Sequence, residues 1–174
     1  MSKKSARRGH KTVAKASSAA IVNRRAGFDY ELGDALTVGL ALTGAETKAA
    51  RLGRVNLRGS YVMPRENRET GRAELFLINA SFSLATNAAK NSGQPTSAVD
   101  TRARKILAKR REIDHLAAGR ANGLTIIPTK LLTRGRFVKL VVALGKGKKK
   151  YDKRETIRRK DLSRENAAIV KNLR

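Results

Sequence analysis

The chain has 174 residues, enough for one ordinary domain with extensions at its ends and too few for two comfortable ones. Its 39 Lys and Arg residues outnumber 14 Asp and Glu residues and give a formal net charge of +25, which repels itself unless a polyanion neutralises it, so nucleic acid is the first partner to consider. The absence of Cys excludes disulfides, thiolate zinc sites and cysteine nucleophiles.

Residues 1–20 are predicted to form a disordered basic N-terminal extension. Up to residue 25 the chain carries eight Lys or Arg and no acid, and its last 30 residues carry twelve against four, so about two thirds of the net charge lies at the two ends. Segments this basic bury too little apolar surface to offset the entropy lost on ordering. No apolar stretch of a secretory signal or a membrane span is visible, and a transit peptide is the less favoured alternative.

The first ordered segment is predicted to begin near Ile21. In 28–32, Phe, Tyr and Leu alternate with Asp and Glu, which is the pattern of a strand with one buried face. Residues 36–44 are mostly apolar and contain two glycines, which suits a buried strand with a bulge or a close approach of backbone.

A short helix is predicted over residues 44–52. Thr43 and Glu46 form a T-x-x-E capping box, in which hydroxyl and carboxylate each satisfy a free amide at the helix start. Gly53 tolerates the left-handed conformation that closes a helix. Spacing favours the cap as the role of Glu46 over a role in orienting the basic side chains of the same helix for RNA.

The middle of the chain is predicted to contain a hairpin, a loop and a helix. Residues 55–64 and 73–84 look like two strands joined by the polar loop RENRETG, and 86–96 are rich in Asn, Ser, Gly and Gln, as in a surface loop. Apolar residues of 101–122 fall roughly on one helical face, with a break near Lys109 left open.

A second hairpin is predicted from 124–132 and 136–144. Pro128 lacks an amide donor, so its strand is expected to be an edge or bulged. About six short antiparallel strands are most economically closed into a small barrel, because closure removes exposed edges. The predicted fold is mainly β, a small closed oligonucleotide-binding-like barrel over residues 21–144 with two or three flanking helices and disordered basic termini.

The sequence offers few candidate catalytic residues. His115 is expected on a helix surface rather than as a catalytic base, and no zinc-protease, nucleophile-elbow or phosphate-loop signature is present. The sequence therefore predicts no enzyme, no cofactor and no metal. An RNA-modifying enzyme remains as a reading that rests only on carboxylates such as Glu31 or Glu46.

Aromatic residues are few, with four Phe and three Tyr. Most of them sit in the apolar phase of predicted strands, where core packing is expected; these are Phe28, Tyr30, Phe76, Phe82 and Phe137. Few rings are then left for a base-stacking platform, so recognition of folded RNA by shape and phosphate contacts fits better.

Four blocks in a fixed order carry a resemblance to a known family: NRRAGFDYE, GLALTGAETKAARLGRVNLRGSYV, TRARKILAKRREIDHL and GKGKKKYDKRETIRRKD. Together they resemble the SmpB family of SsrA-binding proteins, the bacterial partners of transfer-messenger RNA in trans-translation. The resemblance spans about residues 21–174. It implies an oligonucleotide-binding-like barrel, in agreement with the strand count, and a cytoplasmic, monomeric, non-catalytic RNA-binding protein with no membrane association.

The resemblance also implies a set of RNA contacts. The family helix usually read as G-x-E-V-K-S-L-R stands here as GAETKAAR, so its charged residues are kept while three packing positions change. The cations of the third block, Arg104 among them, are either structural or phosphate-contacting, and both readings stay open. The implied RNA-binding residues are Asn23, Arg24, Arg25, Glu46, Lys48, Arg51, Arg102, Lys105, Lys146 and Lys148.

Residues 145–174 form the predicted basic C-terminal tail, disordered when free. In proteins of this family the tail enters the decoding centre and the empty messenger channel of a stalled ribosome. The resemblance implies that Tyr151 stacks on a decoding-centre base, an interaction of about 1 to 3 kcal/mol that needs no base identity. The implied tail contacts are Tyr151, Asp152, Lys153, Arg154, Ile169 and Val170.

The implied function is to bind the tRNA-like domain of transfer-messenger RNA and deliver it to ribosomes stalled without a full codon. The alternative is a small-subunit ribosomal protein that binds rRNA, which the same charge and basic ends would suit. That alternative predicts constant association with the subunit even without transfer-messenger RNA.

Overall fold

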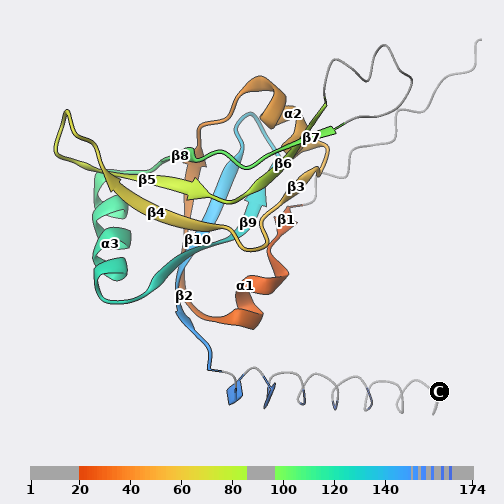
Figure 1. The fold of residues 1–174 in the computed structure, drawn as a ribbon, viewed down its shortest axis with the longest axis vertical. Coiled ribbons are helices and arrows are strands. Elements are labelled where there is room, and N and C mark those ends of the chain that lie inside the picture. The colour runs from red at the N-terminus through yellow and green to blue at the C-terminus, as the bar shows by residue number, and fades with distance from the viewer. Residues whose placement is uncertain are drawn as a thin grey trace, which may run out of the picture.

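The computed structural model describes residues 20–85 and 97–149, together with residues 151, 152, 154, 155, 158, 162 and 165 of the tail. The predictions for residues 1–19 and for the loop at 86–96 lie outside the described residues. In chain order the elements are β1 (Ile21–Val22), α1 (Arg24–Asp29), β2 (Tyr30–Leu40), α2 (Gly44–Arg51), β3 (Val55–Asn56), β4 (Tyr61–Glu66), β5 (Ala73–Ile78), β6 (Ser81–Ala85), β7 (Ser97–Asp100), β8 (Arg104–Leu107), α3 (Arg110–Ala121), β9 (Thr125–Leu132) and β10 (Lys139–Gly147) (Figure 1).

Six antiparallel strands close into a ring. Their order is β9-β10-β2-β8-β5-β4, and β4 pairs back to β9 through Val62 and Ile126. Strand β1 adds to β9, and β3, β6 and β7 form a separate three-stranded sheet. Closure gives each of the six strands a partner on both sides, which removes the exposed edges of an open sheet. The ring confirms the predicted mainly β fold of about six strands with flanking helices.

The core lies inside the ring and consists of aliphatic side chains. Strand β10 shows the expected alternation at its start, where Lys139 is exposed and Leu140 is buried. Each such side chain contributes about 1.5 to 3 kcal/mol when it is fully buried. The completely buried aliphatic residues include Val62, Leu75, Leu77, Ile126, Leu131, Leu140 and Val142.

Helix α2 begins as predicted. The Thr43 hydroxyl accepts a hydrogen bond from the Glu46 amide at 3.3 Å, and the Glu46 carboxylate accepts one from the Thr43 amide at 2.7 Å. Gly53 follows the helix with φ of 72°, in the left-handed region that a side chain disfavours. These contacts confirm the capping box and the terminator.

Residues 101–107 correct the helix prediction. Arg104 and Ile106 are buried while Lys105 and Leu107 are exposed, which is the alternation of a strand, and β8 pairs with both β2 and β5. Only the second half of the predicted helix forms, as α3 from Arg110. The ring therefore overrides the helical pattern, because β8 supplies the strand that joins β2 to β5.

The predicted strand boundaries also change. One strand, β2, replaces the two strands expected at 28–32 and 36–44, and the first two residues of that stretch end α1. Turns divide the strands expected at 55–64 and 73–84, and a positive φ of 58° at Asn79 marks the second division. Strand β6 consequently leaves the ring and pairs with β3 and β7.

The second hairpin is confirmed as β9 and β10. The register shifts between Val141, opposite Lys130, and Val142, opposite Pro128, so the proline stands at a bulge. Its strand is not an edge, since β9 pairs with β10 on one side and with β1 and β4 on the other. The last three residues of β10 belong to the segment predicted as tail.

The described part of the chain lacks two features that would point to other functions. It has no helix that is both long and apolar enough to cross a membrane. It also contains no group of three or more His, Cys, Asp or Glu that could hold a metal ion.

Candidate nucleic-acid interface

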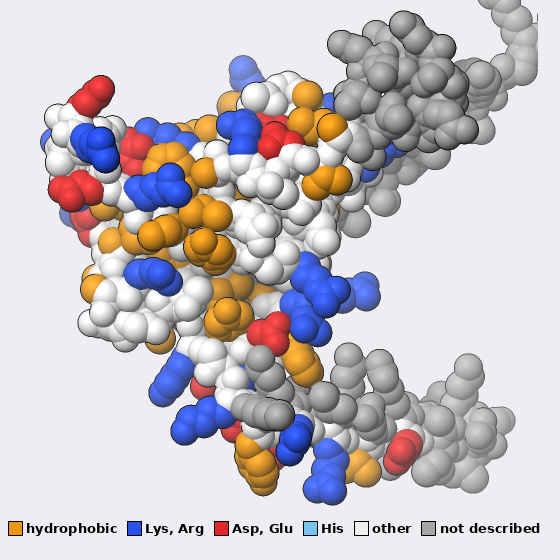
Figure 2. Space-filling model, in the orientation of Figure 1, with side chains coloured by type: hydrophobic (Ala, Val, Ile, Leu, Met, Phe, Trp, Pro, Cys, Tyr) orange, Lys and Arg blue, Asp and Glu red, His pale blue; other side chains and the backbone are white. Residues whose placement is uncertain are grey.

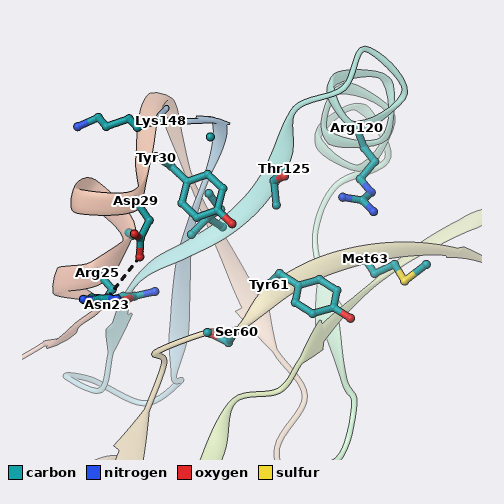
Figure 3. A pocket seen from close by; sticks show the side chains of 14 residues that line it. Asn23, Arg25, Asp29, Tyr30, Ser60, Tyr61, Met63, Arg120, Thr125 and Lys148 are labelled. Carbon is teal, nitrogen blue, oxygen red and sulfur yellow. Dashed lines mark ion pairs between the residues drawn. The ribbon is translucent and has the colours of Figure 1, made fainter. Parts of the chain in front are cut away.

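Basic side chains gather at the end of the ring from which the tail leaves. Figure 2 shows Lys and Arg side chains over the region of α1 and along the described part of the tail. Three of the predicted RNA-binding residues, Asn23, Arg25 and Lys148, meet there around one cavity of about 570 Å³. This cavity, called the tail-root cavity below, is drawn in Figure 3, and its lining includes Asn23, Arg25, Asp29, Tyr30, Tyr61, Arg120, Gly147 and Lys148.

Asn23 holds the chain in place at this cavity. Its side-chain amide donates to the backbone carbonyls of Leu57 at 3.1 Å and Pro128 at 2.9 Å, and the residue is buried. Removing the donor would leave these carbonyls without that partner, which costs about 1 to 3 kcal/mol when they are buried. Asn23 therefore positions the start of α1 against the ring.

Lys148 fixes the direction in which the tail leaves. Its backbone amide donates to the carbonyl of Asp29 at 2.9 Å, and its ammonium group donates to the carbonyl of Gly27 at 3.0 Å. Both acceptors belong to α1, so the tail begins against that helix. Arg25, on the same helix, forms an ion pair with Asp29 at 3.4 Å and keeps about half of its side chain exposed.

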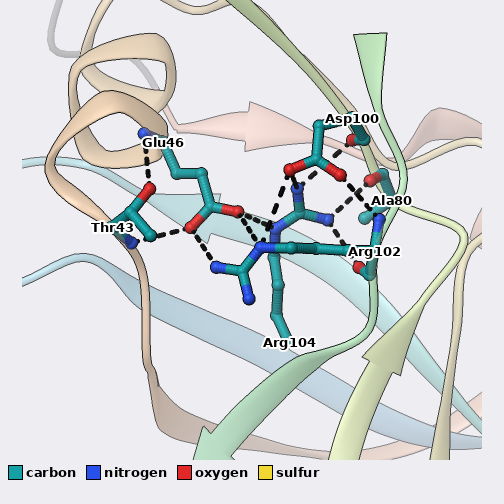
Figure 4. Close-up of polar contacts among 6 residues, drawn as sticks. All are labelled: Thr43, Glu46, Ala80, Asp100, Arg102 and Arg104. Carbon is teal, nitrogen blue, oxygen red and sulfur yellow. Dashed lines mark hydrogen bonds and ion pairs between the residues drawn. The ribbon is translucent and has the colours of Figure 1, made fainter.

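Glu46 occupies the centre of a second cluster, between α2 and the strands β7 and β8 (Figure 4). Its carboxylate is completely buried and accepts hydrogen bonds from Arg102 at 2.8 and 2.6 Å and from Arg104 at 2.8 Å. Arg104 is also fully buried and donates to the carbonyls of Ala80, Asp100 and Arg102. The cluster ties α2 to residues more than 50 positions away.

The charges of this cluster fix the ionisation of the carboxylate. Burial alone would raise the pKa of Glu46, but the hydrogen bonds from Arg102 and Thr43, with the charge of Arg104, lower it from 4.5 to about 2. The bond to Glu46 likewise raises the pKa of the Arg102 guanidinium. Glu46 is thus a permanent anion that balances a buried cation, and Arg104 is structural.

Lys48 and Arg51 lie on the exposed face of α2, away from the carboxylate that faces the core. Arg51 donates to the backbone carbonyl of Arg136 at 3.2 Å, at the turn between β9 and β10. Phe137 in the same turn is 68 % exposed, which corrects its predicted place in the core. Its position before β10 removes it from the alternation of the strand.

The remaining predicted RNA contacts lie apart from these two clusters. Lys105 pairs with Glu74 at 2.7 Å on the β5–β8 side and lowers the pKa of that carboxyl. Lys146 borders a separate hollow with Glu31 and His115. Arg24 borders another hollow beside α1.

From Tyr151 onward, the described tail residues are helical and exposed. Tyr151 is 75 % exposed, and the Asp152 carboxylate accepts a hydrogen bond from the Lys149 amide at 3.0 Å. Arg154 is exposed in the same helical segment. Lys153, Ile169 and Val170 lie outside the described residues.

Three side chains of the tail-root cavity were missed by sequence reasoning: Tyr30, Tyr61 and Arg120. Tyr30 was expected in the core but lines the cavity half-buried, whereas Phe82 is fully buried as predicted. The three residues come from β2, β4 and α3, which are distant in the chain. No local pattern could have joined them, because ring closure alone brings these elements together.

Comparison with known proteins places the chain in a protein family. The family model described as "SmpB protein" matches residues 20–172. The SsrA-binding protein of Koribacter versatilis is 42 % identical over 88 % of this chain and 82 % of its own length, and that of Gloeobacter violaceus is 41 % identical over 82 % and 88 %. A chain of the solved structure "tmRNA-SmpB: a journey to the center of the bacterial ribosome" aligns with a TM-score of 0.57 and 30 % identity, covering 80 % of this chain and 95 % of that one.

Proposed function

The chain belongs to the SmpB family, and on this premise we propose that it binds transfer-messenger RNA and delivers it to stalled ribosomes in trans-translation. The observation that carries the proposal is the family match over residues 20–172. The relatives are named SsrA-binding proteins, and the similar solved chain comes from a tmRNA–SmpB structure of the ribosome. A net charge of +25 suits a polyanionic partner.

Seven of the predicted RNA-binding residues divide into two roles. Arg24, Arg25, Lys48 and Arg51 are exposed and reach solvent from α1 and α2, so we assign them to phosphate contacts. Among the other predicted residues, Asn23, Glu46 and Arg102 act on the protein itself through the bonds described above. Their role is to hold the two helices that carry the cations.

The tail is proposed to occupy the decoding centre and the empty messenger channel. Its start is anchored on α1 by Lys148, and Tyr151 follows with most of its ring exposed. An exposed ring among cations can stack on any base, since every base has a π-face. The segment is proposed to take a fixed place only when the ribosome neutralises its charges.

The role requires positioning rather than catalysis, and we propose a non-catalytic monomer that works in the cytoplasm, where ribosomes translate. Turnover on RNA by the purified protein would contradict this part of the proposal. One of the two carboxylates named for an enzyme has a structural role, since Glu46 neutralises Arg104.

Two measurements test the function. Recovery of the protein from cells at low salt, followed by RNA sequencing, should return transfer-messenger RNA; rRNA without it would favour the ribosomal-protein alternative. A chain that ends at Lys149 keeps the anchor of the tail and should bind the tRNA-like domain with nearly the full affinity while losing the tagging of stalled products. Normal tagging by this truncated chain would show that the role assigned to the tail is wrong.

A further inference from the structure

We propose that the tail-root cavity binds one unstacked nucleotide of the RNA partner, with its base against the rings of Tyr30 and Tyr61 and its phosphate on Arg120. The inference rests on the proposed function and adds a subsite to it. It also changes the expected mode of recognition, because the sequence predicted phosphate and shape contacts with few rings for bases.

The two tyrosines carry the first step. Both rings are half-buried and line the cavity, one from β2 and one from β4 (Figure 3). Neither hydroxyl has a hydrogen-bond partner within the described chain, so both are available to a ligand in the cavity. Two ring surfaces and two unused hydroxyl groups suit a planar ligand with polar edges, as a nucleobase is.

The cations carry the second step. Arg25, Arg120 and Lys148 line the cavity against one carboxylate, that of Asp29. Lys148 donates to the carbonyl of Gly27 and Arg25 pairs with Asp29, whereas the guanidinium group of Arg120 forms no hydrogen bond or ion pair with any described residue. A guanidinium group can bind phosphate through two parallel bonds. Arg120 is therefore the phosphate ligand, and the other two cations raise the local potential.

The volume of the tail-root cavity suits a single nucleotide whose base is neither paired nor stacked. At about 570 Å³ the cavity falls within the range of small-molecule sites, roughly 300 to 1,000 Å³, and admits one nucleotide. A paired or stacked base would present only its edge, so the bound base must be turned out of its helix or loop. Because Gly147 and Lys148 form part of the wall, the bound nucleotide also contacts the first residues of the tail.

Fluorine NMR of protein labelled with fluorotyrosine tests the proposal. The chain has three tyrosines and no Trp, so three signals are expected, and Tyr→Phe variants assign them. The probes are AMP, ribose phosphate and the tRNA-like domain of transfer-messenger RNA. AMP and the RNA should each shift the signals of Tyr30 and Tyr61. AMP should leave the Tyr151 signal unchanged. Ribose phosphate should shift the Tyr30 and Tyr61 signals much less than AMP does.

Two variants test the phosphate ligand. Arg120→Ala should weaken AMP binding at least about tenfold, since even one lost charge-assisted hydrogen bond has that effect and the guanidinium group can form two. The matched control is Arg134→Ala, an exposed arginine in the turn at the other end of the β9–β10 hairpin, which should leave AMP binding unchanged. Arg120→Lys should recover part of the affinity, which a merely structural role would not predict.

The outcomes separate this proposal from the function. Unmoved Tyr30 and Tyr61 signals in a complex that contains the bound RNA would overturn the nucleotide site and leave the function standing. Equal shifts with AMP and ribose phosphate would overturn the base contact. Failure of the unmodified protein to bind the RNA at all would contradict the proposed function itself.

Discussion

Replacing Glu46 with Ala should destabilise the protein strongly, because the carboxylate neutralises a fully buried guanidinium. Removing one partner of a buried ion pair costs about 3 to 5 kcal/mol. Arg104 would keep the Asp100 carboxylate at 3.3 Å and three backbone carbonyls, so the lower end applies, about 3 kcal/mol. That is a large share of the roughly 5 to 15 kcal/mol by which domains are stable.

Thermal and urea unfolding, followed by circular dichroism at neutral pH, measure this cost. The melting temperature should fall by roughly 10 °C for a chain of this size. Glu112→Ala is the matched control. The Glu112 carboxylate also accepts a hydrogen bond from a backbone amide at a helix start, that of Lys109 at 2.8 Å, but this site is exposed and has no buried arginine. Loss of that cap should cost about 1 kcal/mol. Equal destabilisation by the two substitutions would refute the role assigned to the buried ion pair.

Three further predictions follow from the same structure. The pKa of Glu46 in the folded protein is about 2, below its ordinary 4.5. The difference in free energy of unfolding between the wild type and Glu46→Gln should therefore be constant above pH 4.5 and shrink as the pH falls towards 2. A difference that persists in acid unfolding curves would contradict this. Gly145→Ala should lower the free energy of unfolding by about 1 to 3 kcal/mol, since its Cβ would lie 2.8 Å from Ile127, whereas Gly147→Ala in open space should change it little in the same urea titration. RNA affinity should fall linearly with the logarithm of salt concentration, and Lys48→Ala should reduce that slope by about one; an unchanged slope would remove Lys48 from the phosphate contacts.

Local physical chemistry explains the elements that could be predicted. The capping box of α2 and its glycine terminator depend on residues within one or two helical turns, and the β9–β10 hairpin depends on a short turn between two apolar runs. The ring itself followed from the number of strands and the cost of open edges. The RNA partner followed from charge and from family motifs, both of which are properties of composition and order.

Tertiary structure decided the features that depend on distant partners. Residues 104–107 have a helical pattern but form β8, because the ring needs a strand between β2 and β5. The roles of Glu46 and Arg104 depend on a contact across 58 positions, and spacing alone could relate the carboxylate only to its own helix.

The chain by itself thus determined the class of fold, the cap and terminator of α2 and the kind of partner, since these depend on short-range contacts and total charge. Closure of the ring decided which side chains share a site. It buried Arg104 against Glu46, turned Tyr30 and Tyr61 towards one cavity and placed the start of the tail beside them. Such contacts join segments whose separation in the sequence carries no periodic signal, so they arise only when the strands have paired.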